Sequence, residues 1–132
     1  VLSRARMQAG LYPAIDPIAS SSSNLDPLIV GKVHFDVSQE VIRMFNKLEE
    51  LKHIVTVIGI EELSRVDRTL FNRGLKLQNF FTQPVFTAQT HTGYPGQYVP
   101  LAKTIEGCQW ILEGRFDQEP EEIFYMKGAL QK

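Results

Sequence analysis

The side chains that could do chemistry do not form the spacings that phosphoryl transfer or metal catalysis needs. Gly31 and Lys32 resemble the end of a phosphate-binding loop, but Val33 follows where Ser or Thr is required, and Asp26 stands where the loop needs its first glycine. Three scattered histidines and a single cysteine make a poor set of metal ligands. The serine run at residues 20–23 has no base beside it and is typical of a polar linker. We therefore expect no catalytic and no metal-binding residue in this chain by itself.

Aromatic side chains on irregular backbone are the second chemical feature. They are Tyr12, Phe86, His91 and Tyr94. Flat rings held on rigid loops can stack on a purine base. Loop aromatics also fill protein cores, and composition alone favours that second role.

Two irregular stretches carry these rings. Residues 10–31 contain three prolines and two Asp-Pro pairs, which exclude a continuous helix and predict a rigid loop around Tyr12. A short helix over residues 1–9, ended by Gly10, precedes this loop. Residues 82–99 form the second irregular stretch.

Helical periodicity dominates the rest of the chain. Apolar residues alternate at spacings of three and four from Val37 to Ile58, which predicts a helix that Asp36 or Ser38 caps and Gly59 ends. A second helix follows Ser64, which with Asp67 resembles a capping box. The few residues between the two helices predict an αα-hairpin.

Two further helices are predicted after the second irregular stretch. The first follows Pro100 and stops at Gly114, and the last opens at Glu119, runs through Met126 and is closed by Gly128. The expected fold is therefore all-α, a helical bundle over residues 34–132 preceded by an extended Pro/Ser-rich segment over residues 1–33.

Composition restricts the function classes further. The 132 residues fit one domain, and their formal net charge of −1 gives no sign of a nucleic-acid partner. No run of 18 apolar residues is present, so no direct membrane insertion is expected. The start at Val1, without an initiator Met, predicts that a further domain precedes the sequence.

The order of several short motifs resembles the segment that follows the nucleotide-binding domain in the F-type ATP synthase beta subunit, with closest similarity to a sodium-type bacterial and archaeal branch. The similar segments cover nearly the whole chain; they are residues 2–4, 11–17, 25–31, 58–64, 81–84, 92–96, 99–101 and 124–126. The resemblance implies a C-terminal helical domain, with the P-loop, the Mg ligands and the catalytic Glu in the preceding domain.

An adenine pocket is the first function that the resemblance implies. In that family a ring at the position of Tyr12 stacks on adenine, with Pro13 beside it and a small residue at Ala88. The two other pocket aromatics fall on Val85 and His91, and Phe86 is the neighbour that could replace the ring lost at Val85. ATP or ADP with Mg is expected in the full assembly, and no tight binding to this segment alone.

A rotor-contact loop is the second implied function. The family's loop is nearly all acidic, whereas here three acids stand against one arginine, in the order Glu61, Glu62, Leu63, Ser64, Arg65, Val66 and Asp67. The implied partners are alpha-type subunits and the central rotor stalk. The implied location is the cytoplasmic face of a bacterial or archaeal plasma membrane, as a peripheral complex, or alternatively the matrix side of the mitochondrial inner membrane.

Two other functions stay open at this point. Val85, His91 and the less acidic loop favour, as an alternative, a non-catalytic helical interaction module that has lost nucleotide binding. An independent hydrolase has almost no support in the sequence.

Overall fold

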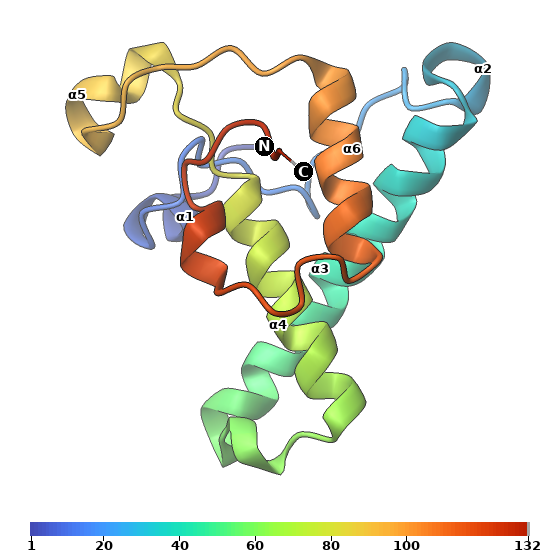
Figure 1. Ribbon diagram of the computed structural model, residues 1–132, viewed down its shortest axis with the longest axis vertical. Helices are drawn as coiled ribbons and strands as arrows, with labels where there is room; N and C mark the ends of the chain where they lie inside the picture. The colour runs from blue at the N-terminus through green and yellow to red at the C-terminus, as the bar shows by residue number, and fades with distance from the viewer. Residues whose placement is uncertain (132) are drawn as a thin grey trace.

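Helices account for the architecture of residues 1–131, which are the residues that the computed structural model describes (Figure 1). Within them, strand-like pairing is limited to one antiparallel bridge between Leu2 and Ile15. The predicted all-α class is confirmed. The α-helices are α1 (Arg4–Gln8), α2 (Pro27–Val30), α3 (Lys32–Ile58), α4 (Arg65–Phe80), α5 (Gln89–Thr92) and α6 (Leu101–Leu112), and the 3-10 turns are Ile60–Glu62, Phe86–Ala88 and Glu121–Phe124.

The hairpin of α3 and α4 forms the centre of the molecule, as predicted. The buried face of α3 recurs at spacings of three and four; it consists of Val37, Val41, Phe45, Leu48 and Leu51. Helix α4 crosses this face closely because Gly74 has no side chain: a Cβ there would lie 3.0 Å from Leu48 Cδ1. In Figure 1 the connection between α3 and α4 forms one end of the molecule, and α2 and α5 lie at the other end.

Helix α3 begins earlier than predicted. It starts at Lys32, directly after Gly31, so neither Asp36 nor Ser38 caps it. Helix α2 was not predicted at all, because Asp26-Pro27 is also a loop signal; here the Asp26 carboxylate accepts a hydrogen bond of 2.7 Å from the Leu28 amide and caps α2. The chain therefore becomes helical inside the stretch that was predicted to be irregular, and the predicted division between residues 33 and 34 falls within α3.

Helix α6 packs against both helices of the hairpin. Its Gly107 faces the Phe80 ring, and α6 ends before Gly114, as predicted. The expected last helix is instead a 3-10 turn ending at Phe124, because the Tyr125 amide donates to the carbonyl three residues back, that of Glu122, at 3.2 Å. No helix in the described residues is long and apolar enough to cross a membrane.

The close contact of α6 with α4 generates a stability prediction. A Cβ on Gly107 would lie 2.5 Å from Phe80 Cζ, and the Phe80 ring is buried, so Gly107→Ala forces one helix to shift. We expect the free energy of unfolding to fall by about 1–3 kcal/mol, as in other overpacked cores. Chemical denaturation measures the change. Gln109→Ala, at an exposed position of the same helix, is the control, and equal stability of the two variants would contradict the close packing.

Candidate functional site

Residues 10–16, which we call the Tyr12 loop, are joined to the first residues of the chain by two main-chain hydrogen bonds. The Ser3 amide donates to the Ala14 carbonyl at 2.8 Å, and the Asp16 amide donates to the Val1 carbonyl at 2.9 Å. The Tyr12–Pro13 peptide bond is cis. The Tyr12 loop is not helical, as its prolines predict, and the two hydrogen bonds hold it against the N-terminal segment.

Tyr12 lies at the surface of the bundle and not in its interior. Its neighbour Leu11 is buried, whereas Tyr12 itself is half-buried. The Tyr12 carbonyl accepts a hydrogen bond of 2.9 Å from the Gln83 amide, just after α4. This bond places the Tyr12 loop beside the start of the second irregular stretch.

The second irregular stretch is a compact loop with its own packing. The Gln97 amide donates to the Pro84 carbonyl at 2.7 Å and closes the loop at its base. The Phe86 ring lies against Gly96, where a Cβ would be 2.3 Å from Phe86 Cδ1. Within the loop Val85 and Ala88 are half-buried, whereas Phe86 and His91 are exposed. We call residues 84–97 the closed loop.

Three tyrosines gather between the Tyr12 loop and the closed loop. The Tyr125 hydroxyl donates a hydrogen bond of 2.6 Å to the Gly10 carbonyl. The Tyr125 ring makes an edge-to-face contact with Tyr94, with a centroid distance of 6.1 Å. Burial raises the pKa of the Tyr125 phenol, and the nearby Tyr94 and Tyr12 phenols raise it further. Sequence reasoning named Tyr94 among the loop aromatics but not in the adenine pocket, and it missed Tyr125, because nothing local in the sequence connects residue 125 with residue 10.

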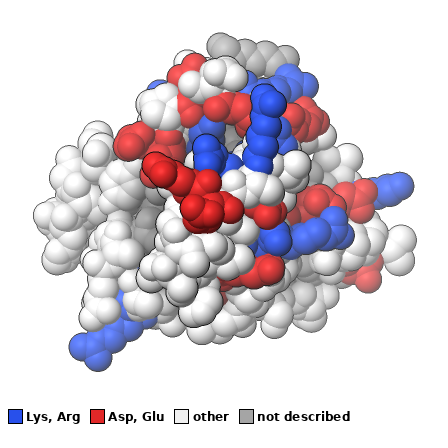
Figure 2. All heavy atoms as spheres, turned by 90° about the horizontal axis from the view of Figure 1, so that it is seen from below, with Lys and Arg blue, Asp and Glu red and all other residues white. Residues whose placement is uncertain are grey.

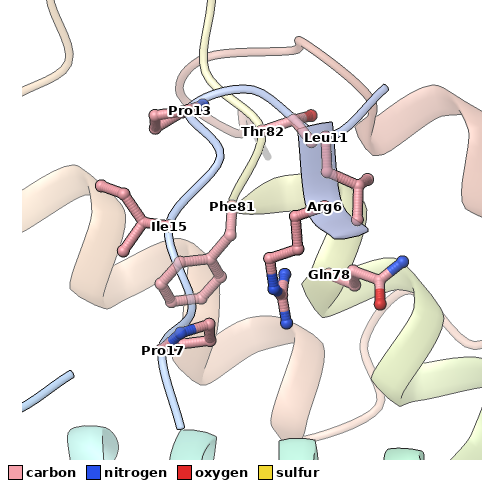
Figure 3. A pocket seen from close by; sticks show the side chains of 8 residues that line it. All are labelled: Arg6, Leu11, Pro13, Ile15, Pro17, Gln78, Phe81 and Thr82. Atoms are coloured by element: carbon pink, nitrogen blue, oxygen red, sulfur yellow. The ribbon is translucent and has the colours of Figure 1, made fainter. Parts of the chain in front are cut away.

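The residues predicted to line the adenine pocket are not gathered in one cavity. Pro13 lines a largely apolar cavity of about 230 Å³, in which the Phe81 ring lies between Arg6 and the stretch from Pro13 to Pro17 (Figure 3). Val85 and Phe86 line a different, more open hollow. In the part of the chain that the structure describes, the predicted pocket residues thus lie on two neighbouring loops and line separate hollows.

The second irregular stretch and its flanks carry no formal charge. No Asp, Glu, Lys or Arg occurs from residue 77 to residue 102. In the part of the chain that the structure describes, no group of three His, Cys, Asp or Glu residues could hold a metal ion. Burial raises the pKa of the Cys108 thiol to about 12, which keeps it protonated and unreactive.

The predicted rotor-contact loop lies at the far end of the hairpin. Leu63 is buried in the core and anchors the turn, whereas Glu61 and Glu62 are exposed. The Ser64 hydroxyl accepts a hydrogen bond of 3.1 Å from the Asp67 amide, so the predicted cap of α4 is confirmed. We call residues 61–67 the hairpin tip.

An arginine outside the predicted set stiffens the hairpin tip. Arg68 Nη2 donates to the carbonyl of Glu61 at 3.1 Å and to that of Ile60 at 3.4 Å. In Figure 2, which looks at this end of the molecule, charged side chains of both signs crowd the middle and right of the view, whereas the left flank, the side on which α5 lies in Figure 1, is largely uncharged. The hairpin tip therefore presents mixed charge on a firmly held turn.

Polar side chains of α4 hold the C-terminal segment. Arg73 Nε and Nη2 donate to the two Asp117 carboxylate oxygens at 2.8 and 2.6 Å. The buried Lys76 ammonium donates to the carbonyls of Phe116 and Asp117, and the Asn79 amide group donates to the Glu121 carbonyl. These contacts, which we call the α4 clamp, fix the segment that leads to Tyr125.

Comparison with known protein families identifies the family to which this helical domain belongs. A family model described as the C-terminal domain of V and A type ATP synthase matches residues 24–118. The chain belongs to this family. The match covers the hairpin, its tip and the closed loop, and membership places the chain in a multi-subunit rotary complex.

The sequence predicted the family and the domain of this ATP synthase chain. The rotary ATP synthase family and its helical C-terminal domain are confirmed by the match. The match, to V and A type ATP synthase, does not support the F-type beta subunit specifically, and Tyr12, Pro13 and Tyr125 lie outside the matched residues. The roles of the pocket residues and of the hairpin tip stay predictions.

The α4 clamp generates a pH-dependent prediction. The hydrogen bonds from Arg73 hold the pKa of Asp117 below its usual 3.8, so the carboxylate stabilises the fold fully above that pH and loses this contribution as the pH falls through the lowered pKa. We expect Asp117→Asn to destabilise the domain by about 1 kcal/mol at pH 7, near the upper end for surface ion pairs. Thermal unfolding over a pH series measures the difference, which should vanish in acid.

The exposed pair of Glu113 and Arg115 supplies the control for this prediction. Glu113 Oε2 accepts from Arg115 Nε at 2.9 Å, but both partners are on the surface, so Glu113→Gln should change the melting temperature little. A melting temperature for Asp117→Asn equal to that of the wild type at neutral pH would contradict the clamp.

Proposed function

We propose that this domain is the C-terminal part of a catalytic-type beta subunit of a rotary ATP synthase of the F-type, and that it supplies part of the adenine pocket and the lever loop that contacts the rotor. The observation that carries the proposal is the position of Tyr12: a half-exposed ring on a loop held by main-chain hydrogen bonds, beside an uncharged second loop. The motif order from residue 2 to residue 126 supports the same assignment.

The chemistry proposed for the two loops is binding of a base. Because the backbone of the Tyr12 loop is already ordered, little backbone conformational entropy is lost when an adenine stacks on its ring, and aromatic faces stack favourably in offset geometry. Pro13, Val85, Phe86, Ala88 and His91 are the proposed companions of Tyr12. The phosphates of ATP or ADP and the Mg ion would be held by residues outside this chain, which agrees with the lack of charge from residue 77 to residue 102.

The mechanical role is proposed for the hairpin tip. Glu61, Glu62, Ser64, Arg65 and Val66 are exposed there, and Leu63 and Arg68 hold the turn that carries them. Exposed ion pairs contribute only about 0–1 kcal/mol each. A stiff turn on two packed helices can therefore push a partner by contact even where its charge is diluted.

The partners and the location follow as part of the same proposal. Alpha-type subunits would flank the domain and the central rotor stalk would meet the hairpin tip. The proposed location is the cytoplasmic face of a bacterial or archaeal plasma membrane, with the matrix side of the mitochondrial inner membrane as the alternative.

A second candidate function is a non-catalytic interaction domain of the same complex. It is favoured by the separation of the pocket residues, because Pro13 and Val85 line different hollows and His91 is exposed. Nucleotide binding by the full-length subunit distinguishes the two candidates.

Removal of the Tyr12 ring tests the adenine role. In the full-length subunit within its complex, we expect Tyr12→Ala to weaken ATP binding about tenfold, since loss of one base–aromatic stack costs about 1–3 kcal/mol. Binding of Mg-tripolyphosphate, which has no base, should not change. Tyr12→Phe keeps the ring and is the matched control. Wild-type ATP affinity in Tyr12→Ala would reject the stacking role and favour the interaction domain.

Changes at the hairpin tip test the lever role. We expect the double variant Glu61→Gln, Glu62→Gln to keep most of the coupling between ATP hydrolysis and ion transport, because it removes charge and leaves the turn in place. Leu63→Ala should reduce coupling more, since it removes the buried anchor of the turn. The ratio of ions transported to ATP hydrolysed in the assembled complex measures both. Loss of coupling in the charge variant alone would mean that the tip acts through its charge.

A further inference from the structure

Tyr125 connects two segments that are far apart in the sequence. Its hydroxyl donates to the Gly10 carbonyl across 115 residues of chain, at 2.6 Å. Its ring meets the Tyr94 ring edge to face at 6.1 Å. The first contact reaches the loop of Tyr12, and the second reaches the closed loop. One side chain thus touches both loops that are proposed to hold adenine.

The position of Tyr125 is itself well determined. The preceding residue, Phe124, is fully buried and packs edge to face against Phe116 at 5.5 Å. The following amide, of Met126, donates to the hydroxyl of the buried Thr82 at 2.9 Å. The α4 clamp holds the segment on the N-terminal side. Contacts on both sides of Tyr125 therefore hold it in place between the Tyr12 loop and the closed loop.

The hydrogen bond acts on the Tyr12 loop close to the ring. Gly10 has a left-handed backbone with φ of 75°, and the Leu11 amide that follows it donates to the Arg6 carbonyl at 2.9 Å. The Gly10 carbonyl lies two residues before Tyr12, so fixing it restricts the direction in which the chain enters the loop. Because the pKa of the Tyr125 phenol is raised, its hydroxyl stays protonated and able to donate at physiological pH.

We propose that Tyr125 is a positioning residue for base recognition, which sets the loop of Tyr12 and the closed loop at the separation that adenine requires. This inference rests on the proposed function, because it presupposes that adenine binds between these loops. The C-terminal segment thereby has a role in nucleotide affinity without touching the nucleotide.

Tyr125→Phe removes the hydroxyl and keeps the ring. In the full-length subunit within its complex, we expect this variant to bind ATP about three- to tenfold more weakly, which corresponds to the loss of one hydrogen bond. Affinity for Mg-tripolyphosphate should stay at the wild-type value, a result that general loosening of the domain would not produce. Competition binding with both ligands measures the two affinities.

Ser38→Ala is the matched control for the lost hydroxyl. The Ser38 hydroxyl also donates to a main-chain carbonyl, that of His34, at 2.8 Å, but it lies in α3 and outside both loops. Its removal should leave both affinities unchanged.

A variant of Tyr94 tests the same contact between Tyr125 and the closed loop. It decides whether Tyr125 positions the loops if the Tyr125→Phe subunit does not assemble into the complex. Tyr94 is 43% exposed, so Tyr94→Leu should fold while losing the ring contact, and ATP affinity should fall. Tyr94→Phe keeps the ring contact, so its ATP affinity should equal that of the wild type.

The outcomes separate this inference from the proposed function. Wild-type ATP affinity in Tyr125→Phe and Tyr94→Leu, together with weakened binding in Tyr12→Ala, would overturn the positioning role alone. Equal losses for ATP and tripolyphosphate in Tyr125→Phe would also overturn it, since they indicate a general structural effect. Unchanged ATP affinity in Tyr12→Ala would overturn the proposed adenine site and the inference with it.

Discussion

The rest of the structure depends on the packing of α4 against α3. This packing is close because Gly74 of α4 meets Leu48 of α3 without a side chain between them. Burial of the apolar faces of both helices provides the main favourable free energy, at about 25 cal/mol per Å² of apolar surface removed from water. Helix α6 then completes the core from the side, where Gly107 allows a second close contact with the Phe80 ring.

Helix α4 uses its remaining surface to organise the C-terminal segment. Arg73, Lys76 and Asn79 recur at spacings of three, so they share one side of the helix. Lys76 is 4% exposed, and its ammonium group is compensated by two main-chain carbonyls. A buried charge of this kind is tolerated only when it is hydrogen-bonded. Through the α4 clamp, the surface of α4 holds the segment that precedes Tyr125, and Tyr125 lies beside the Tyr12 loop.

The two proposed functions lie at opposite ends of the same rigid helix pair. Helix α4 begins at the hairpin tip and ends just before Thr82 and Gln83, which bond to Met126 and Tyr12 respectively. A displacement of the hairpin tip would therefore be passed to the base of both loops through packed helices and not through a flexible linker. This geometry agrees with a helical C-terminal domain of a rotary ATP synthase.

Local patterns in the sequence determined the helical class, the αα-hairpin, the end of α3 at Gly59 and the cap at Ser64, because periodicity and capping depend on residues three or four positions apart. The family was indicated separately, by the resemblance of several short motifs to those of rotary ATP synthases. Helix α2 was missed because Asp26-Pro27 was interpreted as a loop signal, and the start of α3 was missed because no side chain caps it at Gly31. Only the tertiary structure decided that Tyr125 touches Gly10 and Tyr94, that Lys76 is buried, and that Pro13 and Val85 line separate hollows. These relations depend on how distant segments pack together, and no spacing within one segment encodes them.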